Sequence, residues 1–219
     1  MNLDVLISYF PRYAEAFLLT LRIGWLGILL SAAIGIVSAF TMYFKLPVLS
    51  RIAGAYVEIF RNTPLLVQLF FVYFGMPKLG FAISAETCGI VGIGLLGGSY
   101  MSEALRSSLN AVPASQAESA EALGMTHFQA FWLVIFPEAL VLSVPAVVAN
   151  VIFLLKETSV FSAISLMDLM FTAKDLIGLY YDTTEALFML VVFYIIMLVP
   201  VSAAGSALER KARHKMFGE

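Results

Sequence analysis

The chain has 219 residues, of which 61% are hydrophobic and only 13% are charged, and its mean hydropathy is +0.92. Soluble domains carry about 25% charged residues, so a soluble fold of this size could not cover so much apolar surface. The formal net charge is only −2, and we expect no nucleic-acid partner. The composition predicts a single-domain, all-α membrane protein.

Five apolar runs are long enough to cross the hydrocarbon layer, which takes about 20 residues of helix. We expect a transmembrane domain over residues 16–208, an external N-terminal segment over 1–15 and a basic cytoplasmic tail over 209–219. The N-terminal segment lacks the basic start of a cleaved signal peptide. The expected spans are 16–42, 54–75, 82–104, 139–163 and 186–208, with a loop over 105–138.

The placement of Lys and Arg predicts the orientation, because short loops rich in these residues stay in the cytoplasm. With the N-terminus outside, three basic residues fall on the outer side, namely Arg12, Lys78 and Lys174. The cytoplasmic side then holds seven, which are Lys45, Arg51, Arg106, Arg210, Lys211, Arg213 and Lys215. We therefore expect an external N-terminus and a cytoplasmic C-terminus.

Small and helix-breaking residues interrupt several spans. Glycines in the third span weaken an isolated helix but allow close contact in lipid, so this span is expected at the centre of the bundle, the alternative being a merely flexible helix. Pro64 and Pro145 each remove an intrahelical hydrogen bond, and kinks are expected at both. The glycines are Gly89, Gly92, Gly94, Gly97 and Gly98.

The loop between the third and fourth spans is too long and too polar for a simple turn. Ser115 followed by Glu118 matches the S-x-x-E capping box, which predicts a helix that begins at Ser115. Gly124 offers a left-handed exit or room for a close partner. A second helix is expected from Thr126 to Pro137.

One face of the first loop helix is predicted to be apolar, with Ala117, Ala120, Leu123 and Phe128 close together on it. A short helix held across the end of a membrane bundle can act as a lever for a soluble partner. It can equally rest on lipid headgroups. The pattern of residues alone leaves both interpretations open.

The loop also resembles the EAA loop of bacterial ABC-importer permeases. Glu118, Ser119 and Ala120 stand where that loop has E-A-A, Gly124 follows after three residues, and Ile-Phe-Pro ends at Pro137. Ser119 and the Phe before Pro137 replace the usual Ala and Leu, and both are changes of size. Three further stretches resemble the polar amino-acid uptake branch of that family, over residues 58–77, 100–116 and 150–165.

The resemblance implies five transmembrane helices of the ABC importer type-1 kind and a cytoplasmic coupling helix. It implies a permease subunit of an amino-acid importer in a bacterial inner membrane. The expected partners are a cytoplasmic ABC ATPase dimer, a second permease chain (identical or sister), an extracytoplasmic solute-binding protein, the amino acid and membrane lipid. ATP and magnesium are expected in the ATPase, and this chain itself is expected to bind no cofactor or metal.

Five residues of the loop are expected to couple the chain to its ATPase. Glu118 and Gly124 are the principal candidates by resemblance, and Ala120 and Leu123 are expected to sit against the ATPase groove. Ser115 is included as the start of the coupling helix.

Ionisable residues inside apolar spans are costly in lipid and more often face a cavity or a partner. Arg61, Asn62 and Thr63 precede Pro64, whose missing N–H frees a carbonyl near Phe60. We expect a polar niche there that can hold an α-carboxylate or α-ammonium group. The alternative is that Arg61 only braces the bundle by pairing with the carboxylate three residues before it.

A second part of the expected substrate path lies near the end of the fourth span. Glu157 is the candidate for a substrate ammonium group, with Thr158 and Asn150 as neutral hydrogen-bonding residues. The alternative is that Glu157 forms a structural pair. Lys156 is adjacent, so on a helix the two side chains point about 100° apart and cannot both face one cavity. Arg22 is expected to extend to the outer interface instead.

Two other functional classes fit less well. An enzyme would need a nucleophile and base or a metal cluster, but the two histidines, His127 and His214, lie in segments expected to be cytoplasmic, and no Walker A motif occurs. A secondary transporter usually shows internal repeats and more intramembrane carboxylates. The sequence therefore favours a transporter subunit that hydrolyses no ATP itself.

Overall fold

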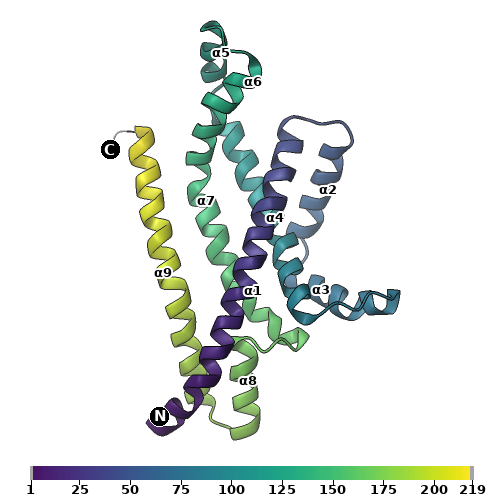
Figure 1. Cartoon of the computed structure of the whole chain (residues 1–219), viewed down its shortest axis with the longest axis vertical. Coiled ribbons are helices and arrows are strands. Elements are labelled where there is room, and N and C mark those ends of the chain that lie inside the picture. The colour runs from purple at the N-terminus through teal and green to yellow at the C-terminus, as the bar shows by residue number, and fades with distance from the viewer. Residues whose placement is uncertain (1, 218–219) are drawn as a thin grey trace.

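The computed structural model describes residues 2–217, and the side chains of residues 2–214. This part of the chain is helical and contains no strand (Figure 1). The α-helices are α1 (Leu3–Tyr43), α2 (Leu49–Arg61), α3 (Leu65–Phe70), α4 (Ala85–Ala111), α5 (Ala114–Ala122), α6 (His127–Ala130), α7 (Phe136–Glu157), α8 (Leu169–Tyr180) and α9 (Thr183–Phe217). The π-helices are η1 (Phe71–Gly75) and η3 (Phe131–Ile135), and the 3-10 helices are η2 (Met76–Leu79) and η4 (Thr158–Ile164).

The described residues hold four helices that are long and apolar enough to cross a membrane, over Leu3–Tyr43, Ala85–Ala111, His127–Ile164 and Thr183–His214. The bent pair Leu49–Arg61 and Leu65–Leu79 makes a fifth span when it is counted as one. The predicted all-α membrane fold is therefore confirmed. The second span differs from the prediction, because it is broken rather than continuous.

The two ends of the molecule carry different segments (Figure 1). The α5–α6 segment, the turn between α1 and α2 and the end of α9 lie at one end, which we call the loop end. The N-terminus and α8 lie at the opposite end, which we call the N-terminal end. The termini therefore lie at opposite ends of the bundle, as an odd number of crossings requires.

Both terminal segments belong to long helices rather than to separate extensions. The segment expected to precede the first span is helical from Leu3, where the Asn2 side chain accepts from the Asp4 N–H at 3.0 Å. Tyr13 in this segment is fully buried, and its hydroxyl donates to the Ala186 carbonyl at 2.6 Å. At the other terminus α9 runs through the expected tail to Phe217.

Helix α4 lies at the centre of the bundle, and 61% of its most apolar 18-residue stretch is buried. It packs against α1, α2, α3 and α7, so the prediction of a central third span is confirmed. Its glycines make the close contacts on several sides: Gly92 approaches Leu69 of α3, whereas Gly97 approaches Ser31 of α1 and Leu154 of α7. The glycines therefore serve more than one face of α4.

Replacing Gly97 with Ala is expected to destabilise the protein. The added Cβ would lie 2.3 Å from the Ser31 Oγ and 2.5 Å from the Leu154 Cδ1, and overpacking of this kind costs about 1–3 kcal/mol. Gly54→Ala in α2 is the control, since its Cβ meets nothing within 4 Å and a helical Ala gains about 0.5–1 kcal/mol over Gly. Thermal unfolding in detergent should show a lower midpoint for Gly97→Ala alone.

Helix α8 was not predicted, and a buried carboxyl group begins it. Asp168 is fully buried, and its Oδ1 accepts from the Phe171 N–H at 2.9 Å as the N-cap of α8. Burial raises the pKa of Asp168 to about 7. The structure therefore shows Asp168 as part of the core at the N-terminal end.

Candidate substrate pocket and docking loop

The chain turns sharply where the predicted second span meets Pro64. Helix α2 ends at Arg61, and the following helical segment leaves at an angle of 105°. Two side chains close the end of α2: the Asn62 Nδ2 donates to the Glu58 carbonyl at 2.7 Å, and the Thr63 Oγ1 donates to the Ile59 carbonyl at 2.7 Å. These bonds replace those lost at the helix end, so the break can exist at membrane depth.

Gln68, on α3, satisfies two further carbonyl groups at this break. Its Nε2 donates to the Phe60 carbonyl at 3.1 Å and to the Thr63 carbonyl at 2.9 Å. The prediction that Pro64 frees a carbonyl near Phe60 is confirmed, and the partner is Gln68. The buried Oε1 of Gln68 has no hydrogen-bond partner among the described residues.

A pocket of about 370 Å³ lies beside this break, and we call it the polar pocket. It is bounded by the end of α2, the start of α3, one face of α4, the end of α7 and the start of η4. The lining consists of Arg61, Asn62, Thr63, Pro64, Leu65, Leu66, Leu96, Tyr100, Phe153, Glu157 and Val160.

Arg61 supplies a cation to the polar pocket. Its Nη1 lies 4.0 Å from the Glu103 Oε2, and its guanidinium carbon lies 5.4 Å from the centre of the Tyr100 ring. Glu103 is held more tightly by Arg106, whose Nη2 lies 2.7 Å from the Glu103 Oε1. The ion pair considered from the sequence, between Arg61 and Glu58, is therefore wrong: Arg61 faces α4.

Glu157 supplies a carboxyl group from the end of α7, where it lines the polar pocket together with Phe153. The other two candidates on this side do not line it. Thr158 is fully buried, and its hydroxyl donates to the Leu155 carbonyl at 2.7 Å. Asn150 is half-buried on α7, about two turns before Glu157. A hydrogen-bonding role for Thr158 toward a substrate therefore does not agree with its position.

Arg22 does not extend alone to the interface. Its Nη2 pairs with the Glu86 carboxylate in the first turn of α4. Both side chains are about half exposed, so the pair ties α1 to α4 at the surface of the bundle.

The docking loop, residues 105–138, contains two short helices as predicted, but it begins differently. Helix α5 starts at Ala114 after Pro113, and no side chain caps it. The predicted capping box at Ser115 and Glu118 is therefore wrong, and both residues are exposed. A capping box is found instead at the next helix, where Thr126 accepts from the Gln129 N–H at 3.3 Å.

Gly124 forms the turn between the two loop helices with a φ of +87°, a left-handed conformation that favours glycine. This turn separates the residues of the predicted apolar face, so that one is buried and two are exposed. Ala120 is 4% exposed because α5 packs on α6 and η3, whereas Leu123 is 82% exposed and Phe128 is 73% exposed. Ala120 therefore contacts its own chain. Leu123 and Phe128 are exposed on either side of the Gly124 turn, and we call this part of the loop, residues 123–128, the tip.

A polar contact closes the turn at the tip, and aromatic contacts tie the loop to the bundle. The His127 Nδ1 lies 2.5 Å from the Glu121 Oε1 across the Gly124 turn. Below the tip, Phe131 is buried between the ends of α1 and α7, with its ring centre 4.8 Å from that of Phe44. The aromatic cluster comprises Phe40, Tyr43, Phe44, Phe131, Trp132 and Phe136.

A π-helix joins the aromatic cluster to α7. The Phe136 N–H donates to the Phe131 carbonyl, five residues back, and Pro137 follows within the first turn of α7. Pro137 has no N–H for a regular helical bond, so the second loop helix passes into α7 through a π-turn instead of ending at Pro137 as predicted. The loop and the fourth span therefore form one continuous rod.

Several residues of these sites were missed by sequence reasoning. Gln68 lies just over one turn after Thr63, whereas Tyr100 and Glu103 lie on α4, far from Arg61 in the sequence. Their roles depend on how α2, α3 and α4 meet. The spacing of Thr126 and Gln129 is a second capping-box match that the sequence contains. It is the signal that could have placed the start of α6.

Comparisons with known proteins agree with this fold. The family described as binding-protein-dependent transport system inner membrane component matches residues 7–214. The arginine transport system permease protein ArtQ of Bacillus subtilis (strain 168) is 32% identical over 216 residues, 97% of this chain and 99% of that protein. The probable glutamine ABC transporter permease protein GlnP of the same organism is 33% identical over 164 residues, 75% of each chain.

Solved structures show the same arrangement of helices. A crystal structure of an amino acid ABC transporter with histidines has a TM-score of 0.90 and 29% identity, covering 96% of this chain and 99% of that one. An inward-facing MetNI methionine ABC transporter has a TM-score of 0.79 at 21% identity, which shows the fold alone. This protein belongs to the family of binding-protein-dependent transport system inner membrane components, the permease subunits of ABC importers.

Proposed function

We propose that this chain is the membrane-spanning permease subunit of an ATP-driven importer for amino acids. It works with a cytoplasmic ATPase dimer, a second permease chain and an extracytoplasmic solute-binding protein. The loop end lies in the cytoplasm and the N-terminal end outside. The relatives named for arginine and glutamine transport support the substrate class.

The polar pocket supports a zwitterionic substrate. Arg61 and Glu157 stand on different walls of it and carry opposite charges, as the α-carboxylate and α-ammonium of an amino acid require. The Arg61 charge is only loosely neutralised by Glu103, at 4.0 Å, so it can still attract a carboxylate. Tyr100 and Phe153 supply apolar walls for the rest of the molecule.

The exposed tip of the docking loop is the observation that carries the proposed coupling. Two large apolar side chains, Leu123 and Phe128, stand in the open beyond the bundle, which favours a protein partner over water. The tip is continuous with α7, and α7 also lines the polar pocket through Phe153 and Glu157. A push on the tip can therefore reach the substrate pocket through one continuous helical segment, His127–Ile164.

The orientation is supported by the distribution of cations. Lys45, Arg51 and Arg210 lie at the loop end, whereas Arg12 and Lys174 lie in segments of the N-terminal end. Positively charged connections stay in the cytoplasm. The docking loop therefore faces the side on which ATP is available.

Reconstitution tests the proposal. In proteoliposomes the purified permease alone is expected to move no labelled amino acid, even under an ion gradient. Adding the ATPase, the binding protein and ATP should start uptake, and omitting any one of them should stop it. Gradient-driven uptake by the permease alone would instead identify a secondary transporter, and the proposed function would be wrong.

A further inference from the structure

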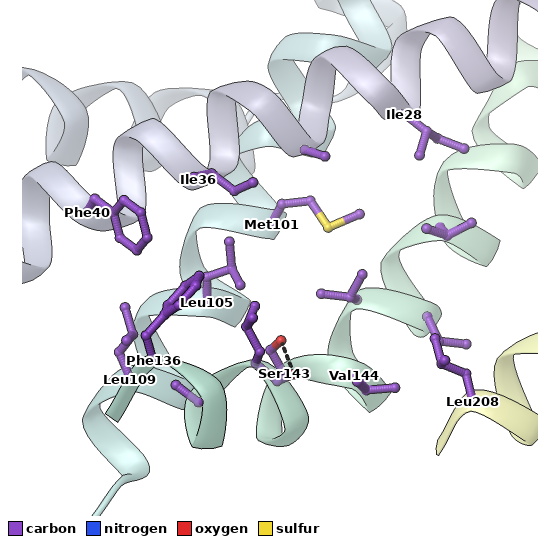
Figure 2. A pocket seen from close by; sticks show the side chains of 16 residues that line it. Ile28, Ile36, Phe40, Met101, Leu105, Leu109, Phe136, Ser143, Val144 and Leu208 are labelled. Atoms are coloured by element: carbon purple, nitrogen blue, oxygen red, sulfur yellow. Dashed lines mark hydrogen bonds between the residues drawn. The ribbon is translucent and has the colours of Figure 1, made fainter. Parts of the chain in front are cut away.

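An apolar groove and the polar pocket both lie between the membrane helices, and they differ in chemistry. Figure 2 shows the groove, which Ile28, Met101 and Val144 line together with other apolar residues. Among its lining residues only Ser143 has a polar side chain, and its hydroxyl donates to the Leu140 carbonyl at 2.8 Å. An amino acid carries two charges, which such a groove cannot pair. Of these two cavities, the polar pocket is therefore the one whose charges can select a substrate.

The residues that line the polar pocket include one basic and one acidic side chain. Arg61, at the end of α2, is the basic one, and Glu157, at the end of α7, is the acidic one. Every amino acid brings one carboxylate and one ammonium group on its α-carbon, and each of these groups needs a partner of opposite charge. Pairing both groups uses both charges of the pocket, so neither remains for the side chain of the substrate.

The charged residues next to this pair add no free charge to the pocket. Glu103 lies 4.0 Å from Arg61, but its carboxylate accepts from the Arg106 Nη2 at 2.7 Å and from the Arg106 Nε at 3.3 Å. Glu103 and Arg106 therefore neutralise each other. Glu58 and Lys156 precede the two charged lining residues in the sequence, and neither of them lines the pocket.

The rest of the lining is neutral, and part of it is deeply buried. Leu65 and Leu96 are 3% and 4% exposed. Asn62 and Thr63 already use their side-chain donors on carbonyl groups of α2. A charged side chain between these walls would lose contact with water and would find no opposite charge, which is costly. An uncharged side chain avoids this cost.

We infer that this chain selects amino acids with an uncharged side chain and discriminates against both cationic and anionic amino acids. Arg61 and Glu157 are then specificity-determining residues, because they pair with the two charges on the α-carbon and leave a neutral site for the side chain. The inference rests on the proposed function, since it takes the polar pocket as the place where the permease binds its substrate.

Amino-acid binding in the absence of the solute-binding protein tests the selectivity of this chain itself. The purified permease–ATPase complex in nanodiscs is titrated with labelled glutamine, leucine, arginine and glutamate. We expect glutamine or leucine to bind at least about tenfold more tightly than arginine and glutamate, because the side-chain charge of the latter two is left without a partner.

Two contrary results of this titration have different meanings. Arginine or glutamate binding as tightly as the better of the two neutral amino acids would overturn the selectivity and leave an amino-acid importer. Binding of none of the four would remove the polar pocket from the substrate path and overturn the inference together with that part of the proposed function.

A matched pair of substitutions at Leu66 tests the count of charges. Leu66 lines the pocket from α3 and is 38% exposed, so a polar side chain can stand there. Leu66→Glu adds a second carboxyl group and should strengthen arginine binding about tenfold, whereas Leu66→Gln, which has the same shape without the charge, should not. Equal arginine binding by the two variants would overturn the inference. The comparison of the four amino acids on the unsubstituted protein stands even if a variant fails to fold.

Discussion

Replacing Leu123 with Asp is expected to abolish ATP-driven uptake while leaving the fold intact. Leu123 is 82% exposed, so a carboxylate there costs the isolated chain almost nothing. In an interface with an ATPase the same change would remove an apolar anchor and bury a charge, and losing such an anchor costs about 2–4 kcal/mol, or roughly 30-fold or more in affinity. ATPase activity measured in proteoliposomes should no longer respond to the loaded binding protein.

The control for this prediction is another exposed leucine at the same end of the molecule. Leu49 begins α2 and is 53% exposed, so Leu49→Asp adds the same charge away from the docking loop. It should keep both transport and stimulated ATPase activity. If Leu123→Asp kept them too, the tip would not be the docking surface.

Gly124, in the turn between α5 and α6, gives a second test of the proposed contact with the ATPase. Gly124→Ala meets no atom within 4 Å in this chain, so its internal cost is only the strain of a positive φ, about 1–2 kcal/mol. If the Gly124→Ala variant loses more of its binding-protein-stimulated ATPase activity than this strain explains, the added Cβ obstructs a partner.

The membrane helices could be predicted from the sequence because a single physical requirement produces them. An apolar run of about 20 residues must satisfy its backbone internally, and a helix does so. The boundaries of the helices were harder to predict. Helix α1 begins at Leu3 because Tyr9 and Tyr13 pack against α8 and α9, and these contacts join residues more than 150 positions apart.

The sites were predicted in part, and the failures have specific causes. Arg61 and Glu157 could be found because charges in apolar runs are rare. Thr158 could not be excluded, because the helix tightens from α to 3-10 at that residue and turns its side chain into the core. Ala120 was misplaced because a nine-residue helix is oriented by what it packs on, here α6 and η3, rather than by its own pattern.

The break at Pro64 shows how far local rules reach. Proline predicts a lost hydrogen bond and a free carbonyl, and both are found. The bend of 105° also depends on three side chains, Asn62, Thr63 and Gln68, that satisfy the exposed carbonyls. Such a network can be recognised only after the two helices are placed. The sequence therefore predicted a kink at Pro64 but not a bend of 105°.

Replacing Arg61 with Gln is expected to reduce amino-acid uptake by about 10- to 100-fold. The substitution removes the cation of the polar pocket, and hydrogen bonds to charged groups contribute about 1.5–3 kcal/mol. The docking loop is unchanged, so ATPase activity should still be stimulated by the binding protein. This combination, slow uptake with stimulated ATPase activity, separates a substrate contact from the coupling contact at Leu123.

The alternative role of Arg61 is to brace α2 against α4 through Glu103, and the pair itself distinguishes the two. If Arg61 is a brace, Glu103→Gln should reproduce the transport defect of Arg61→Gln, because either change breaks the 4.0 Å contact. If Arg61 binds the substrate carboxylate, Glu103→Gln should leave uptake near the wild-type rate, since it removes a competitor for the guanidinium. Thermal unfolding of both variants controls for the second bond of Glu103, to Arg106. Equal transport defects at equal stability would remove Arg61 from the substrate path and leave Glu157 as the charged group of the pocket.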